Sequence, residues 1–217
     1  MTVPTPLVRE PVYVSISGII GAGKSTLAQK LGPILGLPVY EEGVIDNVFL
    51  SKFYNDMAKY SFPLQIHLLN RRFVQQQKIV WDGLGGVQDR TIYEDQIFAK
   101  MLYESNLMEK EAYETYCALF RNMSRFMSRP SLIVHLDVTP EQSLRRINER
   151  NRECESGIKL EYLQKLHLGY ENFLQEISTS VRVIRVDWSE FIDTDKVAQA
   201  ILREHAEMLA IRSVHVK

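Results

Sequence analysis

A phosphate-binding loop motif constrains this chain more than any other feature of its sequence. The segment Gly18–Thr26 reads Gly-Ile-Ile-Gly-Ala-Gly-Lys-Ser-Thr and satisfies the pattern GxxxxGK[ST]. It follows a β-branched run at Val12–Ser17, which predicts a strand, and it precedes a helical pattern at Ser25–Leu35. A strand, a glycine-rich loop and a helix in this order indicate a site for a nucleoside triphosphate.

Each residue type in the motif has a chemical task. Backbone N–H groups must point at the phosphates, and side chains at the three glycine positions would block that approach. Lys24 is expected to reach the β- and γ-phosphates, Ser25 to ligate Mg²⁺, and the helix N-terminus to add partial positive charge. The residues of the loop expected to bind the phosphates of ATP are Gly18, Gly21, Gly23, Lys24, Ser25 and Thr26.

Short apolar runs alternate with helical patterns along the rest of the chain. Further strands are expected at Val39–Tyr40, Val87–Asp89, Ser131–Asp137 and Val181–Val186. Helices are expected at Ile45–Lys59, Pro63–Trp81, Ile92–Leu102, Glu109–Met127, from Pro140 onward, Leu160–Ile177 and Lys196–Leu209. This alternation predicts an α/β fold of the P-loop kinase type, with five parallel strands and helices on both faces. Residues 1–11 are expected to form a flexible extension, and residues 12–217 a single domain.

The charge balance and the cysteine content limit the partners. The 26 Lys and Arg residues against 27 Asp and Glu residues give a formal net charge of −1, which excludes a strong general attraction to nucleic acid. No apolar run approaches the roughly 20 residues of a membrane span. Cys117 and Cys154 lie far apart and form no disulfide framework, which favours a reducing compartment. We expect a cytoplasmic protein with no nucleic-acid or membrane partner.

Charged residues follow two of the predicted strands. Glu41 and Glu42 come after Val39–Tyr40, while Asp89 and Arg90 end the next strand. Ligands of α/β sheets bind at the carboxyl ends of the strands, so these residues are candidates for a catalytic base and an ion-pair clamp. No guanine-reading NKxD element is present, which argues against a GTPase and favours a small-molecule kinase.

Three arginines form a candidate lid. Arg146 and Arg150 are four residues apart and share one helix face, and Arg152 follows them. Planar guanidinium groups can bind phosphate oxygens with paired hydrogen bonds, as a lid that closes over ATP requires. A solvated, charged helix end is the alternative interpretation of these residues.

Taken in order, these segments resemble the deoxynucleoside kinases, P-loop enzymes that phosphorylate the 5′-hydroxyl of deoxynucleosides. The resemblance extends over about Tyr13–Val186, which is most of the chain. Glu42-Gly43-Val44 occupies the family's Glu-Pro-Val segment, which implies that Glu42 rather than Glu41 is the base. Asn47 stands where animal members carry Trp, and this departure is closer to the bacterial-type deoxyadenosine/deoxyguanosine kinases within the branch that also includes deoxycytidine kinases.

The same resemblance implies a set of substrate contacts. Tyr54 corresponds to the tyrosine that binds the sugar 3′-hydroxyl, and Glu155 to the lid glutamate that closes over that hydroxyl. Gln65 corresponds to the glutamine that reads the base, and Phe98 to the aromatic ring that stacks on it. Without the resemblance, Gln65 would be taken for an exposed polar residue of a helix and Phe98 for a core residue.

Arg72 and Asp95 occupy two positions that face the base in family members preferring cytidine or purines. Thymidine-preferring members have uncharged residues there, so the resemblance implies that this pocket disfavours thymidine.

The family's mechanism is in-line transfer of the γ-phosphoryl group of ATP. Asp89-Arg90-Thr91 resembles the D/E-R-S motif, which implies that Asp89 binds near the substrate's 5′-hydroxyl and near Mg²⁺. Ser25 and Asp89 are expected to hold that ion, directly or through water. Arg90, Lys24 and the lid over residues 146–157 would offset the developing charge. Family members are usually homodimers, and Glu109–Met127 is a candidate contact helix.

Two other functions stay open on the sequence alone. A nucleoside-monophosphate kinase, such as a thymidylate kinase, could use Arg72 for the substrate's phosphate rather than for its base. A regulatory P-loop module would hold nucleotide without transferring phosphate.

Overall fold

Five parallel strands form the centre of the molecule. The computed structural model of the chain describes residues 12–42, 47–155, 157–190 and 192–211. The strands are β1 (Tyr13–Ser17), β2 (Val39–Tyr40), β3 (Gly86–Asp89), β4 (Leu132–Asp137) and β5 (Arg182–Asp187). They are ordered β2-β3-β1-β4-β5, and every neighbouring pair is parallel. The predicted α/β fold with a five-stranded parallel sheet is confirmed.

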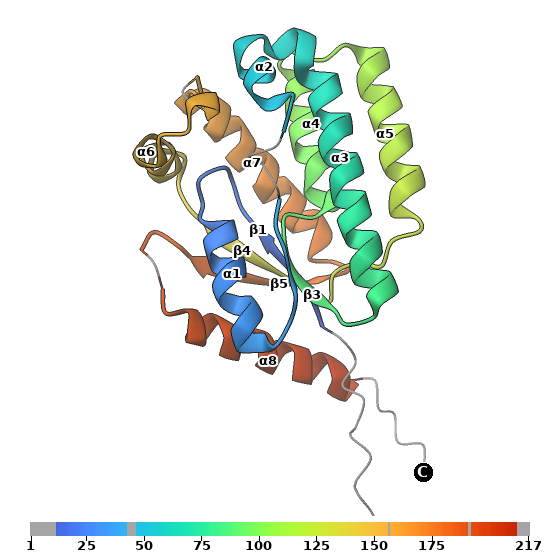
Figure 1. Ribbon diagram of the computed structural model, residues 1–217, viewed down its shortest axis with the longest axis vertical. Helices are drawn as coiled ribbons and strands as arrows, with labels where there is room; N and C mark the ends of the chain where they lie inside the picture. Colours follow the sequence, from blue (N-terminus) through green and yellow to red (C-terminus); the bar gives the residue numbers. More distant parts are fainter. Residues whose placement is uncertain (1–11, 43–46, 156, 191, 212–217) are drawn as a thin grey trace, which may run out of the picture.

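Helices cover both faces of this sheet. They are α1 (Lys24–Leu35), α2 (Leu50–Asn55), α3 (Met57–Asp82), α4 (Asp95–Glu104), α5 (Lys110–Ser124), α6 (Pro140–Arg150), α7 (Leu160–Ile177) and α8 (Thr194–Ile211). Two short 3₁₀ turns lie at Ile92–Glu94 and Glu153–Glu155. Helices α1 and α8 pack together beside the sheet, while α3, α4, α5 and α7 group on its other side (Figure 1). None of the described helices combines the length and the apolar character that crossing a membrane requires.

The central strands are apolar because helices bury them on both sides. Every residue of β1 is buried, including Val14 and Ile16. Since β1 lies between β3 and β4, the loop that follows it emerges at the middle of the carboxyl edge of the sheet. The fold therefore places the Gly18–Thr26 loop where α/β sheets bind ligands.

The predicted division between the helices before and after Pro63 is wrong. Helix α2 ends at Asn55, where the backbone of Asp56 leaves the helical conformation. The Asp56 side chain accepts a hydrogen bond from the Lys59 N–H across 3.1 Å, which begins α3. Helix α3 then runs for 26 residues straight through Pro63. Proline removes one backbone hydrogen bond, and α3 tolerates this loss because it packs against α2, α4 and α5. The predicted extension over residues 1–11 and the start of the predicted helix at residues 45 and 46 lie outside the described residues.

Helices α4 and α7 approach each other closely at a glycine. A Cβ atom at Gly169 would lie 2.6 Å from Cγ2 of Ile97, which is closer than van der Waals contact permits. The absence of a side chain at Gly169 therefore sets the separation of these two helices. The next residue along α7, Tyr170, is fully buried.

Candidate active site

The phosphate-binding loop has the backbone conformation that its glycines allow. Gly21 and Gly23 have φ values of 78° and 96°, which side chains strongly disfavour. A Cβ atom at Gly21 would also lie 2.9 Å from the carbonyl oxygen of Ser143. Lys24 is buried at the start of α1, and its Nζ donates to the Ile19 carbonyl across 3.1 Å. Burial and the nearby Arg90 lower the pKa of Lys24 to about 8, because together they outweigh the acidic neighbours.

Ser25 joins this loop to the end of β3. Its hydroxyl donates to Oδ2 of the buried Asp89 across 2.5 Å. Oδ1 of Asp89 is buried and has no hydrogen-bond partner among the residues that the structure describes. Burial raises the pKa of Asp89, and the charge of Lys24 opposes that shift. A hydroxyl and a carboxylate side by side are the hard oxygen donors that Mg²⁺ prefers, so these residues fit the ion.

The two consecutive glutamates that follow β2 have different surroundings. Glu42 forms ion pairs with Arg72 and with Nε of Arg90, the latter at 3.4 Å. Oε1 of Glu41 instead accepts an exposed hydrogen bond from Gln29 across 2.8 Å. Burial raises the pKa of Glu42, but Arg90, Arg72 and Lys24 together lower it to about 2. Glu42 is therefore an ionised carboxylate that faces the buried cations.

A cavity of about 470 Å³ lies between the phosphate-binding loop and helices α2, α3, α4 and α7. Gln65 in its wall is buried, and its Oε1 has no hydrogen-bond partner among the described residues. Asp95 lies behind the wall and forms an ion pair with Arg72. The predicted substrate residues that line this cavity are Tyr54, Gln65, Arg72, Phe98 and Glu155.

The predicted lid arginines occupy two kinds of position. Arg150 and Arg152 line the cavity and pair with Glu155 at 2.5 and 3.6 Å. The guanidinium of Arg146 points to backbone carbonyls, donating to Ala22 across 3.3 Å and to Trp188 across 2.6 Å. Arg146 thus connects the phosphate loop to the segment after β5, and its contact with ATP remains a prediction.

Arg90 is the most constrained charged residue of the site. It is buried, and its φ of 66° lies in the left-handed region. Nη2 donates to the Gly18 carbonyl across 3.2 Å, Nη1 donates to the Tyr170 hydroxyl across 2.5 Å, and the guanidinium carbon lies 4.7 Å from the centre of the Phe98 ring. This arrangement connects the phosphate loop, Glu42 and the wall of the cavity through a single side chain.

Several residues of the site were not predicted from the sequence. Tyr162 lines the cavity from α7, and Glu94 and Tyr170 are buried beside Arg90. Glu94 had a detectable signal, because it lies three residues after Thr91 and forms a capping box with it. Tyr162 and Tyr170 had none, since a tyrosine in an amphipathic helix is usually a core residue.

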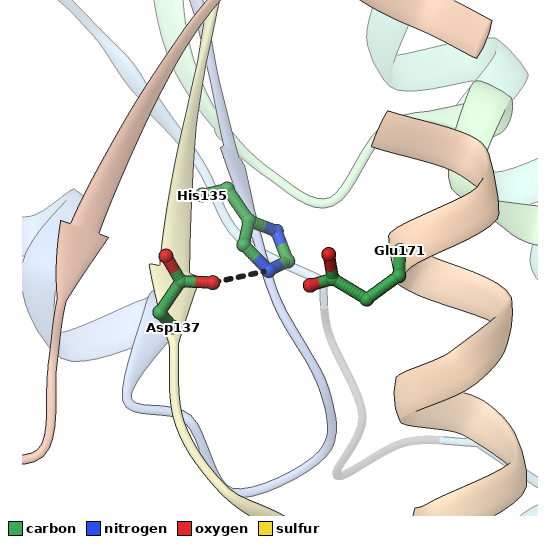
Figure 2. Close-up of side chains that lie close together, drawn as sticks. All are labelled: His135, Asp137 and Glu171. Carbon is green, nitrogen blue, oxygen red and sulfur yellow. Dashed lines mark ion pairs between the residues drawn. The ribbon is translucent and has the colours of Figure 1, made fainter. Parts of the chain in front are cut away.

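A second cluster lies at the end of β4. Figure 2 shows the carboxylates of Asp137 and Glu171 on either side of the buried His135 ring, an arrangement that could hold a metal ion. Nη2 of Arg185 lies 2.6 Å from Asp137 and 2.7 Å from Glu171. The single guanidinium group thus pairs with both carboxylates and offsets one of their two negative charges. His135 also meets the Ser17 hydroxyl at 3.1 Å, immediately before the phosphate loop.

The fold and this site define a P-loop phosphotransferase with a buried pocket for a small organic acceptor. Residues 14–210 match the family model described as deoxynucleoside kinase, and the chain belongs to that family. It is 56% identical over 206 residues to a deoxyadenosine kinase of Dictyostelium discoideum, covering 95% of this chain and 84% of that protein. It is also 35% identical over 200 residues to a deoxyadenosine/deoxycytidine kinase of Bacillus subtilis (strain 168), covering 90% and 92% of the two chains.

A solved structure agrees with these relatives. Deoxyadenosine kinase from M. mycoides with bound dATP is 28% identical, superposes with a TM-score of 0.78, and covers 89% of this chain and 98% of that one. The prediction of an ATP-dependent enzyme that phosphorylates deoxynucleosides for nucleotide salvage is confirmed. A monophosphate kinase and a non-catalytic module are set aside.

Proposed function

We propose that this kinase acts on purine deoxynucleosides or deoxycytidine and disfavours thymidine. The observation that carries this proposal is the guanidinium of Arg72, which lies between Asp95 and Glu42 in the wall of the cavity that Gln65 also faces. A buried ion pair at this position presents fixed donors and acceptors to a base and leaves little room for the 5-methyl group of thymine. The similarity to proteins named deoxyadenosine kinase supports the same choice.

Each pocket residue has a proposed task toward the nucleoside. Gln65 would pair with the base through its amide, and Phe98 would stack on it. Tyr54 and Glu155 would bind the sugar 3′-hydroxyl. Base binding would redirect donors of Arg72 away from Glu42 and leave that carboxylate facing the 5′-hydroxyl.

Glu42 would accept the proton of the 5′-hydroxyl as its oxygen attacks the γ-phosphorus. Lys24, Arg90 and the loop N–H groups would stabilise the charge on the transferring group, and Arg150 and Arg152 would close over it from a lid at residues 146–157. Because phosphoryl transfer needs little covalent chemistry from the protein, positioning by these groups would supply most of the rate.

Ser25 and Asp89 would hold Mg²⁺. Their oxygens lie 2.5 Å apart, and Oδ1 of Asp89, which no described residue contacts by a hydrogen bond, offers a further lone pair. When bound, the ion would supply positive charge that offsets the negative charge developing on the transferring phosphoryl group.

A competition among the four deoxynucleosides tests the substrate proposal. The measurement is kcat/KM for deoxyadenosine, deoxyguanosine, deoxycytidine and thymidine with saturating MgATP. We expect thymidine to be the poorest acceptor by at least about tenfold, since one mismatched polar group in a buried site costs that much or more. A preference for thymidine would contradict the role given to Arg72 and Asp95.

Assembly and location complete the proposal. We propose a cytoplasmic homodimer of single-domain subunits. Exposed apolar side chains can contact a second subunit. Such side chains are found at Leu119 in α5, at Phe126 after α5 and at Leu168 on α7. Cys117 and Cys154 are both free thiols, in keeping with a reducing compartment. Light scattering on the purified protein measures the subunit number, and a monomer at micromolar concentration would rule out the dimer.

A further inference from the structure

Glu94 is a buried carboxylate that no step of the proposed reaction uses. Its side chain is 1% exposed and lies directly before α4. Oε1 accepts from the Thr91 N–H across 3.4 Å, and Oε2 accepts from the Tyr170 hydroxyl across 2.9 Å. A buried carboxylate costs stability unless it is paired, so these partners require an explanation.

Tyr170 connects this carboxylate to Arg90. The same hydroxyl that donates to Glu94 accepts from Nη1 of Arg90 across 2.5 Å. An arginine can only donate, and a phenol has one hydrogen, so the direction of both bonds is fixed. Burial holds the pKa of Tyr170 well above its ordinary value, so the hydroxyl keeps the hydrogen that it donates to Glu94.

The other two nitrogen atoms of the Arg90 guanidinium contact the proposed base and the phosphate loop. Nε lies 3.4 Å from Glu42, and Nη2 donates to the Gly18 carbonyl of the phosphate loop. A planar guanidinium whose two terminal nitrogen atoms donate hydrogen bonds, and whose Nε lies at ion-pair distance from Glu42, cannot rotate without disturbing one of these contacts. The Tyr170 contact is the only one of the three that belongs neither to the phosphate loop nor to the proposed base.

We propose that Tyr170 and Glu94 are positioning residues, which orient Arg90 so that one edge faces Glu42 and another holds the phosphate loop at Gly18. This inference rests on the proposed role of Arg90 in phosphoryl transfer. Neither residue lines the cavity, and the hydrogen bond of the Tyr170 hydroxyl to Arg90 is the polar contact through which both would act.

The test measures the chemical step directly. Single-turnover phosphoryl transfer, with enzyme in excess over deoxynucleoside, is compared for the wild type, Tyr170→Phe, Glu94→Gln and the double variant. Tyr170→Phe keeps the ring against Phe98 and removes only the hydroxyl. We expect the transfer rate to fall roughly tenfold or more, the effect of losing a hydrogen bond to a charged group, with less than about a threefold change in KM for either substrate.

The transfer rate of the double variant, compared with the rates of the two single variants, separates positioning of Arg90 from general destabilisation of the protein. Glu94→Gln turns an amide donor toward Tyr170 and should slow transfer similarly, whereas adding it to Tyr170→Phe should change the rate little further. Tyr13→Phe is the matched control, because it removes another buried hydroxyl, bonded to Gln88 across 2.5 Å in the sheet. This control should lower the melting temperature but not the transfer rate.

Two outcomes would overturn the inference. The first is wild-type transfer in Tyr170→Phe, and the second is additive losses in the double variant. The Arg90→Lys variant shows whether such a result contradicts only the positioning inference or also the proposed role of Arg90 in phosphoryl transfer. If Arg90→Lys is slow and Tyr170→Phe is not, only the positioning inference fails. If Arg90→Lys transfers phosphate normally, the proposed role of Arg90 fails, and the inference fails with it.

Discussion

The hydroxyl of Ser25 and the carboxylate of Asp89 meet across 2.5 Å, although the two residues are 64 positions apart in the chain. The parallel pairing of β1 with β3 produces this contact, because it places the end of β3 beside the loop that follows β1. The proposed magnesium site therefore depends on strand register as much as on the loop motif.

Removing the charge of Asp89 should weaken the binding of Mg²⁺ more than the binding of the nucleotide. In Asp89→Asn we expect the Mg²⁺ concentration for half-maximal rate to rise about tenfold or more, since an ion site loses its charged ligand. Metal titrations of the rate, alongside binding of ATP in EDTA, measure the two effects. Asp187→Asn is the control, because this aspartate also ends a strand of the same sheet but is exposed. Equal metal dependence in the two variants would remove Asp89 from the site.

Glu42→Gln should separate binding from chemistry. The substitution preserves size and removes the proton acceptor, so we expect phosphorylation to fall by about 10²- to 10⁴-fold while ATP affinity is kept. Glu41→Gln, beside it, should retain nearly full activity because Glu41 bonds to the exposed Gln29. Steady-state rates and calorimetric ATP titration provide the comparison. If Glu42→Gln were active and Glu41→Gln inactive, Glu41 rather than Glu42 would be the catalytic base.

Removing both charges of the Arg72–Asp95 pair should relax the choice of base. Truncating one partner leaves a buried charge unpaired, whereas Arg72→Gln with Asp95→Asn removes both charges of the pair and keeps a polar group at each position. We expect the ratio of kcat/KM for deoxyadenosine to that for thymidine to fall at least about tenfold in the double variant. Retention of the wild-type ratio would show that other residues select the base.

His135 should make stability fall in mild acid. Burial lowers its pKa from 6.5 to about 4, against the opposing pull of Asp137 and Glu171 and with the help of Arg185 and Lys24. The unfolded chain therefore takes up the proton first, and stability present above pH 6.5 is lost as the pH falls toward 4.

By pH 5 this loss should reach roughly 2 kcal/mol, the product of 1.5 pH units and the cost per unit. Urea unfolding at pH 7.5 and at pH 5 measures it. His135→Asn cannot take up the proton and retains a polar group near Ser17, so its loss over the same range should be smaller by that amount. An identical loss in wild type and variant would assign the pH dependence to other groups.

The sequence was most informative where the relevant physics is local. The phosphate loop was predictable because its glycines, lysine and serine are all fixed by one short turn. Helix α7 begins and ends at the predicted residues, Leu160 and Ile177. The N-cap at Asp56 was missed because Pro63 is a stronger sequence signal for a helix boundary than a single aspartate.

The contacts that build the site were harder to predict because they join distant segments. Glu94 and Tyr170 are 76 positions apart, and neither residue type indicates the other. The roles of Tyr54, Gln65 and Arg72 came from resemblance to a family rather than from periodicity. The structure adds that the last two are buried in one cavity wall, which helix periodicity alone could not establish.

The glycine at position 169 has a consequence for anyone who engineers this enzyme. Replacing Gly169 by alanine would force Ile97 and α7 apart, since the new methyl group would lie only 2.6 Å from a branched side chain that has no free end to swing away. Tyr170 would move with its helix, away from Glu94 and Arg90. Gly169→Ala, a type of substitution often chosen to stabilise a helix, should therefore slow phosphoryl transfer although Gly169 does not line the cavity of the candidate active site.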